Sequence, residues 1–139
     1  MIMREEERLS YHYLAMKKYL CNKIAGWNIG EFFETYGYTC VALYAVSEFV
    51  EIFIKDIVQY KNVPKIAVYD TFADKIVEPV MGYKVQGRDE LLRKINAGEI
   101  ECIVVCSLMH ENTIFEDLMQ RGVPQEKIIS IASVIYSKQ

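Results

Sequence analysis

Several polar residues stand directly after apolar runs that are expected to be strands. In a parallel sheet, residues at the carboxyl ends of the strands line the crevice where ligands bind. Hydroxyl, carboxylate and imidazole groups can hydrogen-bond a nucleotide or transfer protons. The residues in these positions are Ser47, Asp70, Ser107 and His110.

The segment after the first apolar run is the most informative part of the chain. The expected strand 39–44 leads into AVSEFV at residues 45–50, where a dinucleotide-binding turn has G-x-G-x-x-G. In that motif the glycines allow the tight turn, the approach of the backbone to the pyrophosphate, and close packing of helix on strand. Ala45, Ser47 and Val50 occupy the three glycine positions.

These substitutions predict a turn without its phosphate cradle. A positive φ at Ala45 would be strained because alanine has a Cβ atom. Glu48 and Glu51 place two carboxylates at the start of the helix, where they repel a diphosphate. Ser47 still fits the N-cap of the helix. We therefore expect the strand, turn and helix to form, and we disfavour NAD(P) or a nucleotide-sugar as a ligand. Ala45, Ser47 and Glu48 remain candidate crevice residues.

The other candidates also have two interpretations. Asp70 either holds a ribose hydroxyl or opens the loop 70–74. Ser107, His110 and Glu111 suggest a Ser–His–acid set, but G-x-S-x-G is absent, and an exposed loop histidine is the simpler interpretation. We assign no catalytic residue. The two histidines lack the spacing of a metal site, so we expect no metal.

Hydrophobic periodicity predicts alternating strands and helices. This alternation predicts a three-layer α/β/α fold with a four- to five-stranded parallel sheet and an N-terminal helical extension. Residues 1–27 form the expected extension and residues 28–139 the expected α/β domain. The expected strands are 39–44, 65–69, 83–86, 101–106 and 127–131; the expected helices are 3–24, 28–36, 47–60, 88–96 and 111–121, with a terminal turn or strand at 132–136.

The N-terminal helix carries an apolar stripe at spacings of 4, 3, 4 and 4 residues. One interpretation is that this stripe packs on the α/β domain. The other is that it binds a protein partner or a second copy of the chain, since aromatic residues also concentrate in this part of the sequence. The stripe consists of Leu9, Tyr13, Met16, Leu20 and Ile24.

Composition excludes some function classes. The net charge of −3 and pI near 5.4 argue against a nucleic-acid surface. No apolar run approaches the length of a membrane span. The start of the chain lacks the features of a signal peptide, and the four cysteines contain no CxxC. We therefore expect a cytoplasmic protein with free thiols.

Three stretches resemble a bacterial Rossmann-like domain of polysaccharide and capsule gene clusters. This domain is similar to the N-terminal nucleotide-sugar-binding half of sugar acetyltransferases and to domains fused to glycosyltransferases. The stretches are GYTCVALYAVSEFVEIFIKDI, MGYKVQGRDEL and RGVPQEKIISI.

The resemblance implies a role in bacterial surface-polysaccharide metabolism, and the altered turn favours a non-catalytic or accessory module. Two alternatives remain open. One is a nucleotide- or nucleotide-sugar-binding subunit of a sugar-modifying enzyme. The other is an oligomerisation or partner-binding domain.

Overall fold

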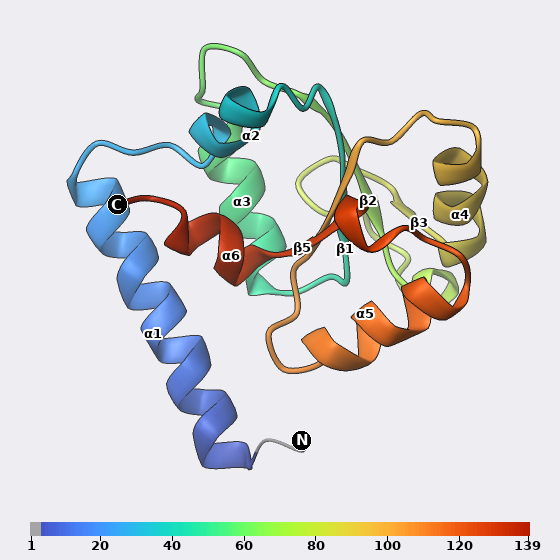
Figure 1. Cartoon of the computed structure of the whole chain (residues 1–139), viewed down its shortest axis with the longest axis horizontal. Coiled ribbons are helices and arrows are strands. Elements are labelled where there is room, and N and C mark those ends of the chain that lie inside the picture. Colours follow the sequence, from blue (N-terminus) through green and yellow to red (C-terminus); the bar gives the residue numbers. More distant parts are fainter. Residues whose placement is uncertain (1–3) are drawn as a thin grey trace.

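Five apolar segments pair as one parallel sheet in the computed structural model, which describes residues 4–139. The strand order is β3-β2-β1-β4-β5, so the chain leaves the central β1 first toward one edge and then toward the other (Figure 1). This order confirms the predicted fold class and places a topological switch point between β1 and β4. The strands are β1 (Cys40–Tyr44), β2 (Lys65–Tyr69), β3 (Val85–Gln86), β4 (Cys102–Val105) and β5 (Ile128–Ser130).

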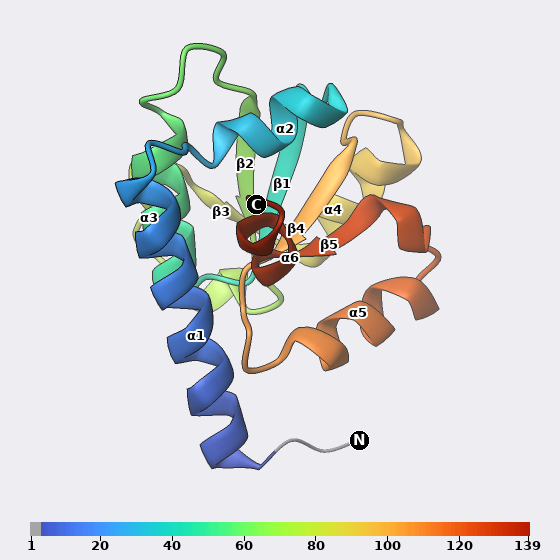
Figure 2. The ribbon, with the colours of Figure 1, turned by 60° about the vertical axis from the view of Figure 1, so that its left-hand side comes forward.

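Helices cover both faces of the sheet (Figure 2). A hydrophobic core lies on each face of the sheet. Because neighbouring strand residues point to opposite faces, Leu43 of β1 belongs to the first core and Tyr44 to the second. The first core is covered by α1 (Glu5–Ile24), α2 (Gly30–Tyr36), α3 (Glu48–Ile57) and α6 (Ile131–Tyr136). The second is covered by α4 (Arg88–Asn96) and α5 (Glu111–Gln120).

Some predicted elements differ from the structure: α3 ends at Ile57 instead of residue 60, and β3 begins at Val85 instead of residue 83. The terminal segment, predicted as a turn or strand, is the helix α6, because the Ser130 hydroxyl accepts a hydrogen bond from the Ser133 N–H at 3.0 Å and caps it. Helix α2, predicted over 28–36, begins at Gly30. The Asn28 Oδ1 accepts from the Gly30 N–H at 2.7 Å, and the Glu31 carboxylate accepts from the Asn28 N–H at 2.8 Å, so Asn28 still caps the first turn of this helix. Met3, predicted as the first residue of the N-terminal helix, lies outside the described residues.

A buried carboxylate ties α1 to the α/β domain. The Asp56 side chain, on α3, is 5% exposed and accepts hydrogen bonds from the Lys23 ammonium at 2.5 Å and from the Ile29 N–H at 3.0 Å. The Asn28 amide donates to the same carboxylate at 3.0 Å. Asn22 adds a buried hydrogen bond of 2.9 Å to the Ile135 carbonyl of α6. Helix α1 is therefore held by polar contacts at its C-terminal end.

The interpretation in which the apolar stripe of α1 packs on the α/β domain is wrong for most of the stripe residues. Ala15, Tyr19 and Asn22 are the buried residues of this helix. Met16 is partly buried against the first core, as predicted. The rest of the stripe faces away from the domain: Leu9, Tyr13, Leu20 and Ile24 are all exposed.

We predict that Asp56→Ala lowers the free energy of unfolding by about 2–4 kcal/mol, because it removes a charged acceptor and leaves several donors without their partner. Urea denaturation measures the change. Glu34→Ala is the matched control, since this carboxylate is hydrogen-bonded to Asn62 on the surface. It should change stability by less than about 0.5 kcal/mol. Equal effects of the two substitutions would contradict the role of Asp56.

Candidate functional site

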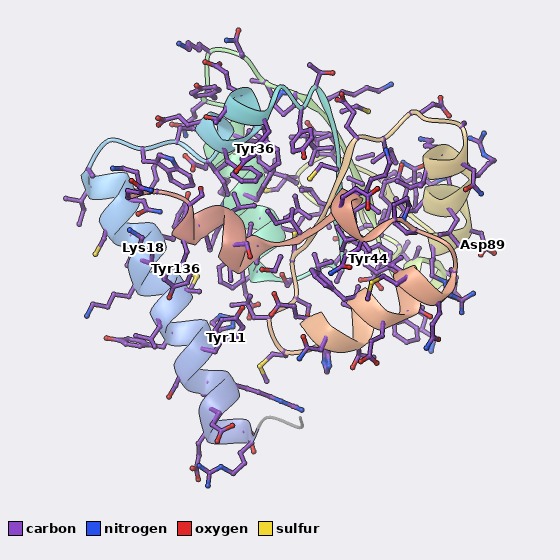
Figure 3. All side chains as sticks on the ribbon, viewed as in Figure 1. Tyr11, Lys18, Tyr36, Tyr44, Asp89 and Tyr136 are labelled. Atoms are coloured by element: carbon purple, nitrogen blue, oxygen red, sulfur yellow. The ribbon has the colours of Figure 1, made fainter. Side chains whose placement is uncertain are left out.

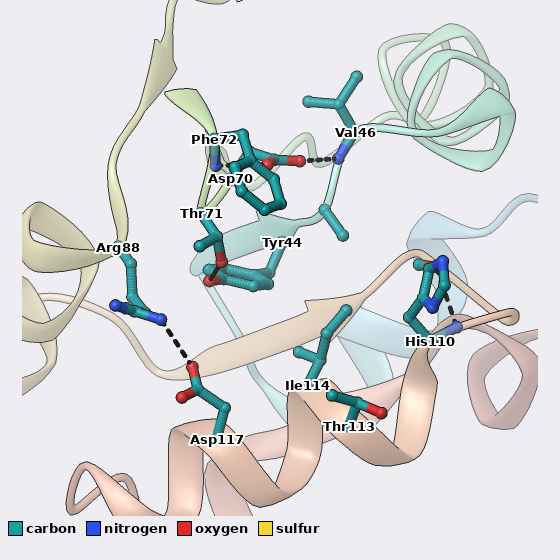
Figure 4. A pocket seen from close by; sticks show the side chains of 12 residues that line it. Tyr44, Val46, Asp70, Thr71, Phe72, Arg88, His110, Thr113, Ile114 and Asp117 are labelled. Atoms are coloured by element: carbon teal, nitrogen blue, oxygen red, sulfur yellow. Dashed lines mark hydrogen bonds and ion pairs between the residues drawn. The ribbon is translucent and has the colours of Figure 1, made fainter. Parts of the chain in front are cut away.

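A cleft of about 460 Å³ opens at the carboxyl ends of β1, β2 and β4 (Figure 4). Its position is the switch point of the sheet, where ligands of open α/β folds bind. Four of the six predicted crevice residues line it: Ala45, Asp70, Ser107 and His110. The remaining lining residues are Tyr44, Val46, Thr71, Phe72, Arg88, Thr113, Ile114 and Asp117.

The turn after β1 keeps the shape of a glycine turn without the glycine. Ala45 has a φ of 79°, in the left-handed region that costs a residue with a Cβ atom about 1–2 kcal/mol. The Ala45 N–H donates to the Tyr69 carbonyl at 2.9 Å. The next N–H, of Val46, donates to Oδ2 of Asp70 at 2.8 Å. These two backbone donors are therefore used inside the protein.

Asp70 binds the backbone on both sides of the cleft. While Oδ2 accepts from Val46, Oδ1 accepts from the Phe72 N–H at 2.8 Å (Figure 4). The carboxylate thus joins the turn after β1 to the loop after β2. Each oxygen accepts one backbone N–H, so the side chain links the two loops.

The remaining turn residues are also committed to the fold. Ser47 caps α3 as predicted, accepting from the Phe49 N–H at 3.2 Å, and its hydroxyl donates to the Cys106 carbonyl at 2.8 Å. A hydroxyl has one hydrogen, so Ser47 has none left to donate to a phosphate. Val50 is fully buried in the first core. Glu48 is exposed and is not among the residues that line the cleft.

The Ser–His–acid arrangement is not formed. The Ser107 hydroxyl accepts from the backbone N–H of His110 at 3.3 Å. The Glu111 carboxylate accepts from the Tyr11 hydroxyl at 3.0 Å. Figure 3 shows Tyr11 on α1. Burial, followed by the charge of Glu111, raises the pKa of Tyr11. Glu111 therefore links α5 to α1.

Two polar pairs that the sequence analysis missed lie in the cleft. Arg88, at the start of α4, binds Asp117 of α5 with 3.0 Å between Nη1 and Oδ2. Burial pushes the pKa of Asp117 up, but nearby arginines outweigh it and lower the pKa overall. The hydroxyls of Tyr44 and Thr71 lie 2.5 Å apart. Burial raises the pKa of Tyr44, although the Thr71 hydrogen bond opposes it.

The sequence contained a signal for some of these residues. Thr71 and Phe72 follow β2 directly, and Arg88 follows β3, so the rule that selected Asp70 also applies to them. Asp117 lies within α5, six residues after its first residue Glu111, and no strand end points to it. Its place in the cleft follows only from the packing of α5 beside α4.

Comparisons with known proteins do not assign the chain to a family. No family model, curated protein or solved structure matches the chain. Within residues 4–139, no three His, Cys, Asp or Glu side chains form a cluster that could hold a metal ion. Over the same residues, no helix is both long enough and apolar enough to cross a bilayer.

We predict that Ala45→Gly raises the free energy of unfolding by about 0.5–1 kcal/mol, because relief of the left-handed strain exceeds the added entropy of the unfolded chain. Thermal or urea denaturation measures it. Ala67→Gly, within β2, is the control and should destabilise the protein, since glycine weakens a strand interior. A loss of stability in Ala45→Gly would contradict the strained turn.

Proposed function

We propose that the chain is a non-catalytic, accessory Rossmann-like module of bacterial surface-polysaccharide metabolism, whose nucleotide crevice is degenerate. The pathway context comes from the resemblance of the three sequence stretches. In this proposal the module acts by binding a protein, either another component of the pathway or a second copy of the chain, through α1.

One observation carries the proposal: the Asp70 carboxylate accepts the Val46 N–H in the turn after β1. A Rossmann turn binds a pyrophosphate with its backbone N–H groups and the start of the following helix. Here a fixed negative charge takes one of those donors, and the Ser47 hydroxyl is used by Cys106. A diphosphate would have to displace the carboxylate and approach it closely, which is costly for two anions.

The proposal predicts that calorimetry with NAD, NADP and UDP-sugars detects no binding tighter than about 1 mM, which corresponds to about −4 kcal/mol. Asp70→Ala removes the competing carboxylate, so it should leave the affinity unchanged or increase it. Asp70→Asn is the control, because it keeps an oxygen that can accept the Val46 N–H. Micromolar binding by the unmodified protein would contradict the proposal.

A nucleotide- or nucleotide-sugar-binding subunit is the second candidate, favoured by the cleft itself. The cleft offers the Arg88 guanidinium, and the Phe72 ring that lines it is 60% exposed. The Nε of Arg88 is buried and has no hydrogen-bond partner among the described residues. A cation and an exposed aromatic ring that line one cleft suit a phosphorylated nucleoside bound away from the turn, although the phosphate would have to compete with Asp117 for Arg88.

This second candidate predicts a measurable affinity that depends on the cleft. Arg88→Gln and Asp70→Ala should each weaken nucleotide or UDP-sugar binding at least about tenfold, or 1.4 kcal/mol. Arg93→Gln is the matched control, because Arg93 is an exposed arginine of the same helix, paired with Glu90. Binding that is equally strong in all three variants would place the ligand outside the cleft.

A further inference from the structure

Helix α1 exposes an apolar stripe that its own domain does not cover. The face that packs on the domain carries Ala15, Tyr19 and Asn22. The stripe lies about a third of a turn away around the helix, at 3.6 residues per turn. Its exposed members are Leu9 (58%), Tyr13 (63%), Leu20 (60%) and Ile24 (87%), with Met16 partly buried between them.

The spacing of the stripe suits a second helix. Intervals of 4, 3, 4 and 4 residues approximate the alternating spacing by which paired helices interdigitate. Four of the five stripe residues are exposed, so a helix laid along the stripe would contact side chains that the domain does not cover. Both ribbon views show the N-terminal half of α1 extending beyond the sheet and its covering helices (Figures 1 and 2).

The charges along α1 select an orientation for that second helix. The N-terminal end, from Arg4 to Arg8, carries three glutamates and two arginines, with Glu7 paired to Arg4, and so has a net charge of −1. The second half carries Lys17 and Lys18, whereas Lys23 is held by Asp56. In an antiparallel pair of identical helices, the acidic end of each lies toward the basic half of the other. A parallel pair would bring the two acidic turns together, which is unfavourable. The helix surface is therefore complementary to itself.

We propose that two copies of the chain form a two-fold symmetric dimer through antiparallel pairing of α1 along this stripe. The two-fold axis lies between Leu14 and Ala15 in sequence, so Leu9 faces Leu20 of the second copy, and Tyr13 faces Met16 of the second copy. Such a contact is isologous and closes on itself. The proposal rests on the partner-binding part of the proposed function and identifies the partner.

The mass of the full-length protein in solution tests the pairing. Light scattering or sedimentation should give twice the chain mass of 16.2 kDa. Leu20→Glu and Leu9→Lys should each raise the dimer dissociation constant at least about tenfold, because each buries an unpaired charge at the seam. The double variant should recover dimerisation, since the new lysine of one copy faces the new glutamate of the other at both ends of the seam.

Leu14→Glu is the control, because Leu14 is also exposed (49%) but lies on another side of α1. It should leave the dimer intact. A monomeric unmodified protein would overturn the proposal. Failure of the double variant to recover would overturn the antiparallel pairing, because a parallel pair places Leu9 against Leu9. Binding of the protein to lipid vesicles or to another protein, with no dimer, would assign the stripe to that ligand instead. Calorimetry with nucleotides is independent of these outcomes and tests the crevice separately.

Discussion

The Asp70 carboxylate is the contact on which the geometry of the crevice depends. It holds the Val46 N–H on one side and the Phe72 N–H on the other, so it fixes the loop after β1 relative to the loop after β2. Two hydrogen bonds to a charged acceptor, at about 1.5–3 kcal/mol each, are enough to offset the left-handed strain at Ala45. In a dinucleotide-binding protein the backbone donors of this turn serve the ligand. In this chain the Ala45 and Val46 N–H groups instead bind the Tyr69 carbonyl and the Asp70 carboxylate.

A second carboxylate, that of Asp56, fixes the position of α1 on the α/β domain. Asp56 and Asn22 hold this helix by polar contacts, and Ala15 and Tyr19 pack on the first core, so of the apolar stripe the attachment to the domain uses Met16 alone. The apolar side chains of Leu9, Tyr13, Leu20 and Ile24, which a contact between α1 and the domain would ordinarily bury, are left exposed. The same helix therefore has one face that joins it to the α/β domain and another that is free to bind a partner.

The sequence predicted the sheet well because continuous apolar runs between turn residues are strong signals. The bounds of β2 and α4 match the prediction, and the order of elements led to the correct fold class. It failed at α6, where the β-branched residues Ile131, Val134 and Ile135 favour a strand locally. The Ser130 cap and packing against α1 select the helix instead.

The sequence predicted which residues lie in the cleft better than it predicted what their side chains bind. The rule that strand ends line the crevice selected Asp70, Ser107 and His110, and all three lie in the cleft. The direction of each side chain was not available from the sequence. Whether Asp70 faces a ligand or the Val46 N–H depends on the φ of Ala45, and a periodic pattern does not reveal a backbone angle. Likewise, no pattern indicated that Glu111 binds Tyr11 of α1.

The most direct test of the degenerate crevice is the electron density at the end of β1 in crystals soaked with NAD or a UDP-sugar. Our account predicts that the Asp70 carboxylate remains on the Val46 N–H and that no phosphate occupies the turn. A diphosphate bound to the Val46 N–H, with the Asp70 side chain turned away, would contradict it.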